Sequence, residues 1–310
     1  MTPWHVLALP PLPLDLLRNV TAPLAGLIEL SVPATRDRAG LLAALADAEI
    51  VLGDYTAELA LDAEAVKAAP RLAFVQQPSV GVDGHDLDAL AAAGIPLANT
   101  AGVSAVAVAE WCLAATLALL RKLVAADAAV RAGEWPQLTL QPRELSGSKV
   151  GLVGYGPIGR ECERLFAAFG CEVTHWSRSS QREPLETLLA TSDVVVVVIA
   201  LADGTRGLVD PALMKPGAVL VNAARGGIVR ESGLEHLGGV ALDVFEREPL
   251  PAADPVLELP NTLLSPHVAG VTPQSTMRLF GVVLDNLRAA VSGEPVAHVL
   301  NGASPQVDRR

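Results

Sequence analysis

Short apolar runs of strand length alternate with alanine- and leucine-rich runs of helical length through the first hundred residues. Strand-like runs lie at residues 4–9, 49–53 and 72–77, and helical runs lie at residues such as 41–48 and 87–94. Alternating strands and helices are typical of a parallel sheet, because each crossover between parallel strands needs a long connection. This part of the chain therefore predicts an α/β domain.

A second alternating region begins at Lys149, after a long helix predicted from Ser104 to Arg131. Residues 149–178 predict a strand, a glycine turn, a helix and a strand. Four further β-branched runs follow at residues 193–201, 218–224, 239–244 and 262–266. These runs are continuous rather than alternating, which indicates strands covered on both faces. The predicted fold class is α/β, with two Rossmann-like, doubly wound parallel-sheet domains and a cleft between them.

Domain limits follow from the same pattern. A last helix is predicted from Thr272 to Gly293, where a threonine cap precedes a proline at the first helical position. We expect one domain to span residues 99–284. Residues 1–98 and 285–310 would then join to form the other.

A glycine loop follows the first strand of the second region. Gly154, Gly156 and Gly159 form a G-x-G-x-x-G pattern between a predicted strand and a predicted helix. The first glycine permits a tight turn, the second permits close approach of a pyrophosphate, and the third lets the helix pack on the strand. Pro157 and Ile158 complete the loop at the helix N-terminus, whose free N–H groups favour phosphate. These five residues predict a dinucleotide site.

The end of the next strand bears on which dinucleotide binds. An NAD site usually carries an acidic residue there for the ribose 2′-hydroxyl, but this chain has Ser177, Arg178 and Ser179. An arginine between serines suits a 2′-phosphate. The sequence therefore favours NADP(H) over NAD. The alternative is that Arg178 is a solvated surface residue and NAD binds without it.

Three side chains suited to chemistry follow the last predicted strands. Arg225, Glu248 and His267 each come shortly after a strand end, the edge at which open α/β sheets bind ligands. An imidazolium can give a proton to a carbonyl oxygen, and a nearby carboxylate stabilises that cation. An arginine can bind a carboxylate with two parallel bonds. These groups fit hydride chemistry at carbon 2 of a 2-oxo or 2-hydroxy acid.

Several motifs in a fixed order resemble the D-isomer-specific 2-hydroxyacid dehydrogenase family, in particular its glyoxylate/hydroxypyruvate reductase-like members. They are SVGVD at 79–83, NTAGVSAVAVAE at 99–110, GYGPIG at 154–159, NAARG at 222–226, LDVFEREP at 242–249 and SPHVAG at 265–270. The resemblance implies an NAD(P)-dependent oxidoreductase. It also implies that residues 99–284 bind the dinucleotide and that the other domain binds the substrate.

The resemblance assigns further roles. It implies that Arg225, Glu248 and His267 are catalytic and that Arg225 and His267 contact both substrate and cofactor. The backbone N–H groups of Val80 and Gly81 would bind the substrate carboxylate. Further cofactor contacts would come from Ala223, Ala224, Asp243 and Gly270, with Asp243 approaching the nicotinamide carboxamide. The family also implies a homodimer built around the helix that begins near Ser104.

The chain departs from the family pattern in two places. The stretch Val198-Ile199-Ala200-Leu201 stands where His-x-Pro-Leu is usual, so the cofactor wall at Ile199 is expected to differ. After Arg225 the segment that leads to the next strand is short, and Arg230 stands where an aspartate is common. A helix in that segment is expected to be trimmed.

Related functions remain as alternatives. Formate dehydrogenases place a glutamine where Glu248 stands, which argues against that branch. Phosphite-oxidising relatives keep the same three residues, so the motifs do not separate them. A corepressor-type regulator that senses the dinucleotide without catalysis is the non-enzymatic alternative. The identity of the 2-oxo acid is open, with glyoxylate, hydroxypyruvate, pyruvate and bulkier acids all compatible.

Charge and composition bear on the partners and the cellular location of the protein. The net charge of −11 lacks the basic footprint of a nucleic-acid-binding protein. The apolar segment 102–120 approaches the length of a membrane span, but Glu110 in its middle favours a buried protein contact instead. Three cysteines without metal-ligand spacing indicate reduced core thiols and no metal site, and no leader sequence is evident. We therefore expect a cytoplasmic protein.

Overall fold

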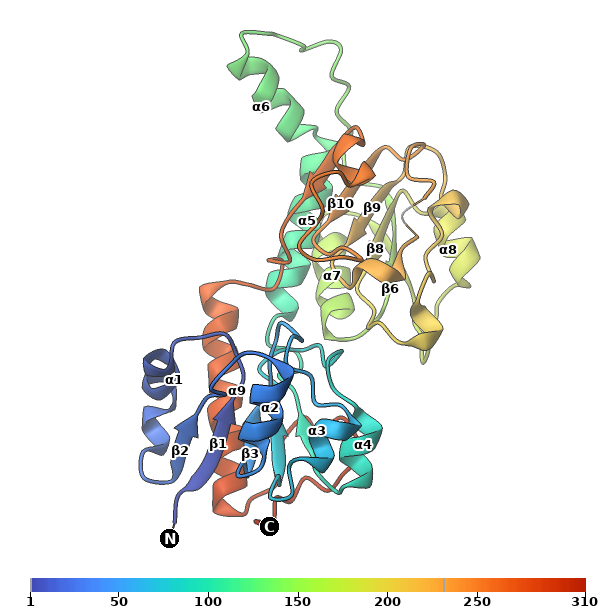
Figure 1. Cartoon of the computed structure of the whole chain (residues 1–310). Helices are drawn as coiled ribbons and strands as arrows, with labels where there is room; N and C mark the ends of the chain where they lie inside the picture. Colours follow the sequence, from blue (N-terminus) through green and yellow to red (C-terminus); the bar gives the residue numbers. More distant parts are fainter. Residues whose placement is uncertain (1, 231) are drawn as a thin grey trace. The chain divides into compact units, whose positions relative to one another are not determined.

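The computed structural model describes residues 2–230 and 232–310, and it divides the chain into two compact units (Figure 1). Unit 1 comprises Met1–Val103 and Pro273–Arg310, and unit 2 comprises Ser104–Thr272. Each unit is an α/β domain built on a parallel sheet. The prediction of two parallel-sheet α/β domains is confirmed.

Unit 1 holds a five-stranded parallel sheet in the order β2-β1-β3-β4-β5. Its strands are β1 (Trp4–Ala8), β2 (Ile28–Ser31), β3 (Ile50–Leu52), β4 (Phe74–Gln76) and β5 (Leu97–Ala98). Its α-helices are α1 (Leu14–Thr21), α2 (Arg38–Leu45), α3 (Ala63–Lys67), α4 (Leu87–Ala92) and α9 (Pro273–Ser292), and η1 (Ala22–Leu24) is a 3₁₀ turn.

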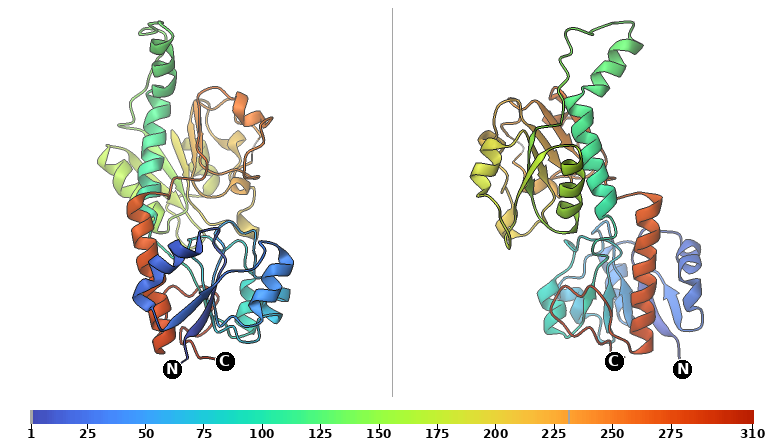
Figure 2. Two further views of the ribbon diagram at one scale, coloured as in Figure 1. Left: turned by 60° about the vertical axis from the view of Figure 1, so that its left-hand side comes forward. Right: turned by 180° about the vertical axis from the view of Figure 1, so that it is seen from behind.

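Alternate residues of these strands enter two separate cores. Leu7, Val51 and Val75 pack with α2, α3 and α4, whereas Val6 and Phe74 pack with α1 and α9. Figures 1 and 2 show α9 beside the strands of this unit. Because both faces are covered, the strands read as continuous apolar runs in the sequence.

Unit 2 holds a six-stranded parallel sheet in the order β11-β10-β9-β8-β6-β7. Its strands are β6 (Lys149–Val153), β7 (Glu172–Trp176), β8 (Val194–Val197), β9 (Val219–Asn222), β10 (Gly239–Leu242) and β11 (Thr262–Leu264). Its α-helices are α5 (Ala105–Leu120), α6 (Leu123–Arg131), α7 (Pro157–Ala168) and α8 (Leu185–Thr191). Short 3₁₀ turns are η2 (Asp203–Thr205), η3 (Pro211–Leu213), η4 (Gly226–Ile228) and η5 (Pro255–Glu258).

The sheet of unit 2 is also covered on both faces. Cys112 of α5 and Phe166 of α7 lie in one core with Val196 and Val221 of the sheet, and Leu188 of α8 lies in the other core. The strand order reverses between β8 and β6, which is the position where open α/β sheets bind ligands at the carboxyl ends of their strands.

The predicted helix from Ser104 to Arg131 is two helices in the structure. The helix α5 ends at Leu120, and α6 begins at Leu123. Lys122 adopts a left-handed conformation with φ of 52°, which interrupts the helical hydrogen bonding. None of the residues of α6 is buried, and Figure 2 shows α6 extending away from the sheet of unit 2.

Unit limits in the structure differ from the predicted domain limits. The first lies after Val103 instead of residue 98, and the second lies after Thr272 instead of residue 284. The whole of α9 belongs to unit 1 because Val283 and Leu287 are buried in that unit's core. The connection from β9 to β10 contains only the 3₁₀ turn η4 among its described residues, in keeping with the short segment seen in the sequence.

Across residues 2–230 and 232–310, no helix combines the length and the apolar character that crossing a membrane requires.

Candidate active site

The carboxyl ends of β9, β10 and β11 lie in register at one edge of the unit 2 sheet. Asn222 pairs with Leu242, and Leu242 pairs with Leu264. Arg225 follows β9 by three residues, and His267 follows β11 by three residues. Neighbouring strands are about 4.8 Å apart, so the three strand exits fall within one small region of this unit.

Arg225 stands on a turn that its own neighbours fix. Nδ2 of Asn222 donates to the carbonyl of Arg225 at 3.1 Å, and Oδ1 of Asn222 accepts from the amide of Ala224 at 3.1 Å. Gly226 follows, where a Cβ atom would lie 2.0 Å from the carbonyl carbon of Phe245. Only glycine fits there, which explains the Arg-Gly pair of the motif. The guanidinium is half-buried.

His267 and Glu248 form an ion pair when the imidazole is protonated. Nδ1 of His267 lies 2.8 Å from Oε2 of Glu248, and their side chains are 46% and 37% exposed. The other carboxylate oxygen of Glu248 accepts from the amide of Phe245 at 3.0 Å, which fixes the carboxylate. The structure therefore brings together two of the predicted catalytic residues, with the imidazole still open to solvent.

Asp243 organises the loop that carries His267. Its carboxylate is 2% exposed and accepts hydrogen bonds from Ser265 Oγ at 2.5 Å and from the amides of Val268 and Ala269 at 2.8 Å. Its carbonyl accepts from the amide of His267 at 2.8 Å. His267 has a φ of 56°, a conformation that non-glycine residues rarely adopt. The bonds to Asp243 hold it there, a role that the sequence did not predict.

The glycine loop has the form that a pyrophosphate requires. Gly154 has a φ of 113°, and a Cβ there would lie 2.7 Å from the amide nitrogen of Ile199. A Cβ on Gly159 would lie 2.3 Å from the carbonyl oxygen of Gly154. By contrast, a Cβ on Gly156 would meet nothing within 4 Å, so the backbone is open at that residue. Pro157 is the first residue of α7, as predicted.

The turn after β7 presents two of the three residues predicted there. Ser177 is buried, and its hydroxyl donates to the carbonyl of Ser180 at 2.7 Å while accepting from the amide of Ser180 at 3.0 Å. That hydroxyl closes the turn rather than facing solvent. Arg178 and Ser179 are both exposed on it.

An aromatic stack joins the glycine loop to β7, and no pattern in the sequence indicated it. The rings of Tyr155 and His175 are 3.6 Å apart and parallel within 4°. The Tyr155 hydroxyl donates to Glu163 of α7, which also pairs with Arg182 at 2.7 Å. Burial lowers the pKa of His175 below its usual range. The stack therefore holds Tyr155 of the loop against β7.

The remaining predicted cofactor residues of unit 2 are placed at strand ends. Ile199 follows β8 and is 9% exposed, and Ala224 is 6% exposed. Ala223 and Gly270 are half-buried. Their positions are compatible with a cofactor wall, and their roles stay predictions.

Val80 and Gly81 follow β4 in unit 1. Val80 is 41% exposed. Within residues 2–230 and 232–310, the amide N–H groups of Val80 and Gly81 donate to no protein acceptor. Two adjacent, accessible N–H groups are a suitable binding site for a carboxylate.

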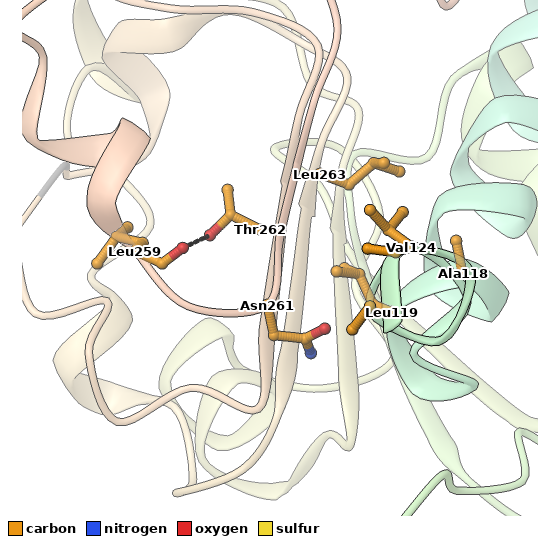
Figure 3. A pocket seen from close by; sticks show the side chains of 9 residues that line it. Ala118, Leu119, Val124, Leu259, Asn261, Thr262 and Leu263 are labelled. Carbon is orange, nitrogen blue, oxygen red and sulfur yellow. Dashed lines mark hydrogen bonds between the residues drawn. The ribbon is translucent and has the colours of Figure 1, made fainter. Parts of the chain in front are cut away.

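A pocket of about 220 Å³ lies elsewhere in unit 2 (Figure 3). Leu119 of α5, Val124 of α6 and Asn261 are among its lining residues. Asn261 precedes β11, whereas His267 follows it. The pocket is therefore at the opposite end of this strand from the predicted catalytic residues.

The chain is similar to a known family and to several known proteins. Residues 113–269 match the sequence model described as "D-isomer specific 2-hydroxyacid dehydrogenase, NAD binding domain". The chain is 37% identical to (S)-sulfolactate dehydrogenase of Chromohalobacter salexigens, with 74% of the chain and 81% of that protein covered. It is 35% identical to glyoxylate reductase of Aeropyrum pernix, with 78% and 80% covered.

Further matches extend to longer proteins and to solved structures. The chain spans only 53% of D-3-phosphoglycerate dehydrogenase of Mycobacterium tuberculosis, at 35% identity over 86% of its own length. The crystal structure of a glyoxylate reductase from Paecilomyes thermophila matches with a TM-score of 0.85 and 27% identity, with 97% of this chain and 98% of that one covered.

Proposed function

Because this chain belongs to the D-isomer specific 2-hydroxyacid dehydrogenase family, we propose that it reversibly reduces a small 2-oxo acid to the D-2-hydroxy acid. The family resemblance predicted from the motifs is confirmed, as is the prediction of an NAD(P)-dependent oxidoreductase. The individual roles of the residues below are our proposals.

The observation that carries the mechanism is the 2.8 Å contact between His267 and Glu248. In the direction of reduction, the imidazolium of His267 gives its Nε2 proton to the carbonyl oxygen of the substrate. Glu248 accepts the Nδ1 hydrogen bond, fixes the ring orientation and stabilises the cation. In the direction of oxidation, the neutral imidazole takes the proton from the hydroxyl group. The exposure of the imidazole leaves it accessible to a substrate.

We assign binding and polarisation of the substrate to Arg225. Its guanidinium, on the turn after β9, suits a carboxylate because it offers two parallel hydrogen bonds. A positive charge near the carbonyl oxygen also stabilises the negative charge that develops as the hydride arrives. We propose that the amides of Val80 and Gly81, in unit 1, bind the substrate carboxylate as well.

We propose NADP(H) as the preferred dinucleotide, with NAD as the alternative. The dinucleotide supplies the hydride, and the loop Gly154–Gly159 with the N-terminus of α7 would hold its pyrophosphate. Exposed Arg178 and Ser179 would bind the 2′-phosphate. Asp243 would accept from the nicotinamide carboxamide. An ionised carboxylate offers about four lone-pair positions, and the three bonds to Ser265, Val268 and Ala269 leave one for this contact.

The proposed substrates are small acids with a carbonyl at carbon 2. The relatives are named for sulfolactate, whose 2-oxo form is sulfopyruvate, and for glyoxylate, so sulfopyruvate, glyoxylate and hydroxypyruvate form the first panel. Residues of unit 1 near Leu52 to Tyr55 would face the rest of the substrate, because they follow the carboxyl end of β3.

We propose a homodimer formed through α5, α6 and the segment after them. Val124 and Val130 are 60% and 54% exposed, and Trp135 and Leu138 are 78% and 89% exposed. So many exposed apolar side chains in one segment favour a protein contact. The partners are otherwise small molecules, since the net charge of −11 disfavours nucleic acid. We propose a cytoplasmic location, which the three free cysteines favour.

Oxidation of NADH and NADPH over the panel of 2-oxo acids tests the proposal, with chiral analysis of the product. The unchanged protein should reduce at least one acid, and the product should be the D isomer. His267→Asn should lower kcat by about a hundredfold or more. His236→Asn is the matched control, because His236 is exposed in the same unit and its Nε2 lies 3.1 Å from the carbonyl oxygen of Met214.

Each result that would contradict the proposal points to a different alternative. Tight dinucleotide binding without turnover of any acid would favour the non-catalytic regulator. Reduction of NAD(P)+ by phosphite, without turnover of any 2-oxo acid, would favour the phosphite-oxidising relatives. An L product would overturn the stereochemistry, and full activity in His267→Asn would remove His267 from the reaction.

A further inference from the structure

The segment Ser79-Val80-Gly81 of unit 1 is held through its carbonyl groups. The amide of Thr100 donates to the carbonyl of Ser79 at 3.1 Å, and Nδ2 of Asn99 donates to the carbonyl of Val80 at 2.7 Å. The hydroxyl of Ser79 donates to the carbonyl of Gly81 at 2.7 Å. Every carbonyl of the segment therefore has a donor of its own.

These contacts fix the direction of the two N–H groups. In a planar trans peptide, the C=O of one residue and the N–H of the next point in opposite directions. Holding the carbonyl of Ser79 therefore orients the N–H of Val80, and holding the carbonyl of Val80 orients the N–H of Gly81. Thr100 and Asn99, which follow β5, thus set the direction of both amides.

A second series of hydrogen bonds reaches the same segment and begins at Leu61 and His85. The amide of Leu61 donates to Nδ1 of His85 at 3.3 Å, and Nε2 of His85 lies 2.9 Å from Oε1 of Gln77. Nε2 of Gln77 then donates to Oγ of Ser79 at 2.9 Å. A backbone N–H is always a donor, so Nδ1 of His85 accepts and Nε2 of the neutral ring donates to Gln77. Gln77 in turn donates to Ser79, and Ser79 donates to the carbonyl of Gly81.

The side chains of this hydrogen-bonded series are closely packed. Gln77 is 3% exposed. A Cβ on Gly53 would lie 1.9 Å from Oε1 of Gln77 and 2.9 Å from Nε2 of His85, so a side chain at residue 53 would displace both groups. Burial lowers the pKa of His85 to about 4. The imidazole therefore stays neutral near pH 7, which the one-way series of bonds requires.

We infer that Asn99 and the series His85–Gln77–Ser79 are positioning residues that hold the N–H groups of Val80 and Gly81 toward the substrate carboxylate. The inference rests on the proposed function, because it takes the ligand to be a carboxylate. None of these side chains is assigned to touch the substrate or the cofactor. Their effect is on the affinity for the acid, through the orientation of two peptide planes.

Asn99→Ala is the direct test, and Asn301→Ala is its matched control. Both asparagines lie in unit 1, and each makes one bond to a carbonyl and one to an amide. Asn99 bonds to Val80 and Ala101, whereas Asn301 bonds to Ile95 and Leu97 at the other end of β5. Both variants lose the same kinds of bond, so both should lower Tm. Only Asn99→Ala should affect the loop.

Glyoxylate and hydroxypyruvate serve as probe substrates, and oxamate serves as an unreactive analogue. In Asn99→Ala, KM for the acid and the inhibition constant of oxamate should rise about tenfold, with little change in kcat. The Kd of NADPH should stay within about twofold of the unchanged protein. Asn301→Ala should leave all of these constants unaltered.

The series through His85 is tested by rescue. His85→Leu removes the donor to Gln77 and should raise KM about as much as Asn99→Ala. His85→Gln retains an N–H donor at the position of Nε2, and it should restore most of the lost affinity. Equal KM values in Asn99→Ala, His85→Leu and the unchanged enzyme would overturn this inference alone. Failure of the unchanged enzyme to reduce any acid would instead overturn the proposed function, and this inference with it.

Discussion

The imidazole of His267 and the carboxylate of Glu248 meet at 2.8 Å although the two residues are nineteen positions apart in the sequence. The contact depends on two loops that leave adjacent strands, β10 and β11, at the same edge of the sheet. Each loop is fixed by a backbone amide or carbonyl, through Phe245 for Glu248 and through Asp243 for His267. These contacts thus hold both side chains of the pair in place.

Glu248→Gln should lower kcat for reduction and alter its dependence on pH. The neutral amide no longer stabilises the positive charge of the imidazolium that donates the proton. We expect a loss in kcat of about tenfold to a hundredfold at pH 7. The measurement is a full pH profile of kcat and kcat/KM.

Glu246→Gln is the control for that profile, because Glu246 lies two residues away and pairs with exposed Arg206 at 3.3 Å. It should keep the profile of the unchanged enzyme. If the Glu248→Gln profile also coincided with it, the carboxylate would have no part in proton transfer.

Arg225→Ala should raise KM for the acid and lower kcat, because binding of the carboxylate and polarisation of the carbonyl are both lost. A combined loss of about a hundredfold or more in kcat/KM is expected for charge-assisted bonds of this kind. Arg225→Lys should recover only part of the lost kcat/KM, since an ammonium group lacks the bidentate geometry of a guanidinium. Steady-state kinetics with saturating dinucleotide measures both.

Arg230→Ala is the matched arginine control, as Arg230 is also in unit 2 and pairs with Asp210 at 2.6 Å. It should leave kcat/KM within about twofold. An Arg225→Ala enzyme that behaved like this control would exclude Arg225 from substrate binding.

Arg178→Ala should separate the two dinucleotides. The side chain is exposed on the turn after β7, and only NADPH carries a 2′-phosphate for it to bind. KM for NADPH should rise about tenfold while KM for NADH changes little. Arg164→Ala, which removes another exposed arginine of unit 2, paired with Glu161 at 2.9 Å, should change neither. Equal losses with both dinucleotides would show that Arg178 does not recognise the phosphate.

The strands and the strand-end residues could be predicted because their signals are local. Continuous apolar runs mark strands covered on both faces, and Arg225 and His267 follow such runs directly. The glycine pattern is equally local, since its three glycines lie within one strand–turn–helix unit of the sequence. For this reason the sequence could predict that these residues follow the carboxyl ends of strands.

Features that depend on distant contacts were not predicted. The interruption at Lys122 is a single left-handed residue in a segment whose composition favours a continuous helix. The stack of Tyr155 on His175 and the bonds of Asp243 to the loop at 265–269 arise from tertiary packing. The assignment of α9 to unit 1 also depends on tertiary packing. In the sequence, its buried residues show only the pattern of an ordinary amphipathic helix.

Arg309 should stabilise unit 1 in a pH-dependent way, through Glu49. The guanidinium bonds to both carboxylate oxygens at 2.7 and 2.8 Å and lies 5.0 Å from the ring of Trp4, which ties the C-terminal segment to the first strands. Hydrogen bonding to Arg309 lowers the pKa of Glu49 to about 2 from 4.5. A lowered pKa gives stability that is fully present above pH 4.5 and is lost as the pH falls toward 2.

Arg309→Met should therefore lower the free energy of unfolding by roughly 2 kcal/mol at pH 7. The difference from the unchanged protein should shrink at pH 3, where the unfolded state has already taken up its proton and the folded state is beginning to. Urea unfolding at the two pH values measures it. Arg288→Met, which breaks an exposed pair with Asp285 at 3.4 Å in the same unit, should cost less than about 0.5 kcal/mol at either pH. A constant difference between Arg309→Met and the unchanged protein from pH 7 to pH 3 would mean that Arg309 acts by packing on Trp4 rather than through the charge of Glu49.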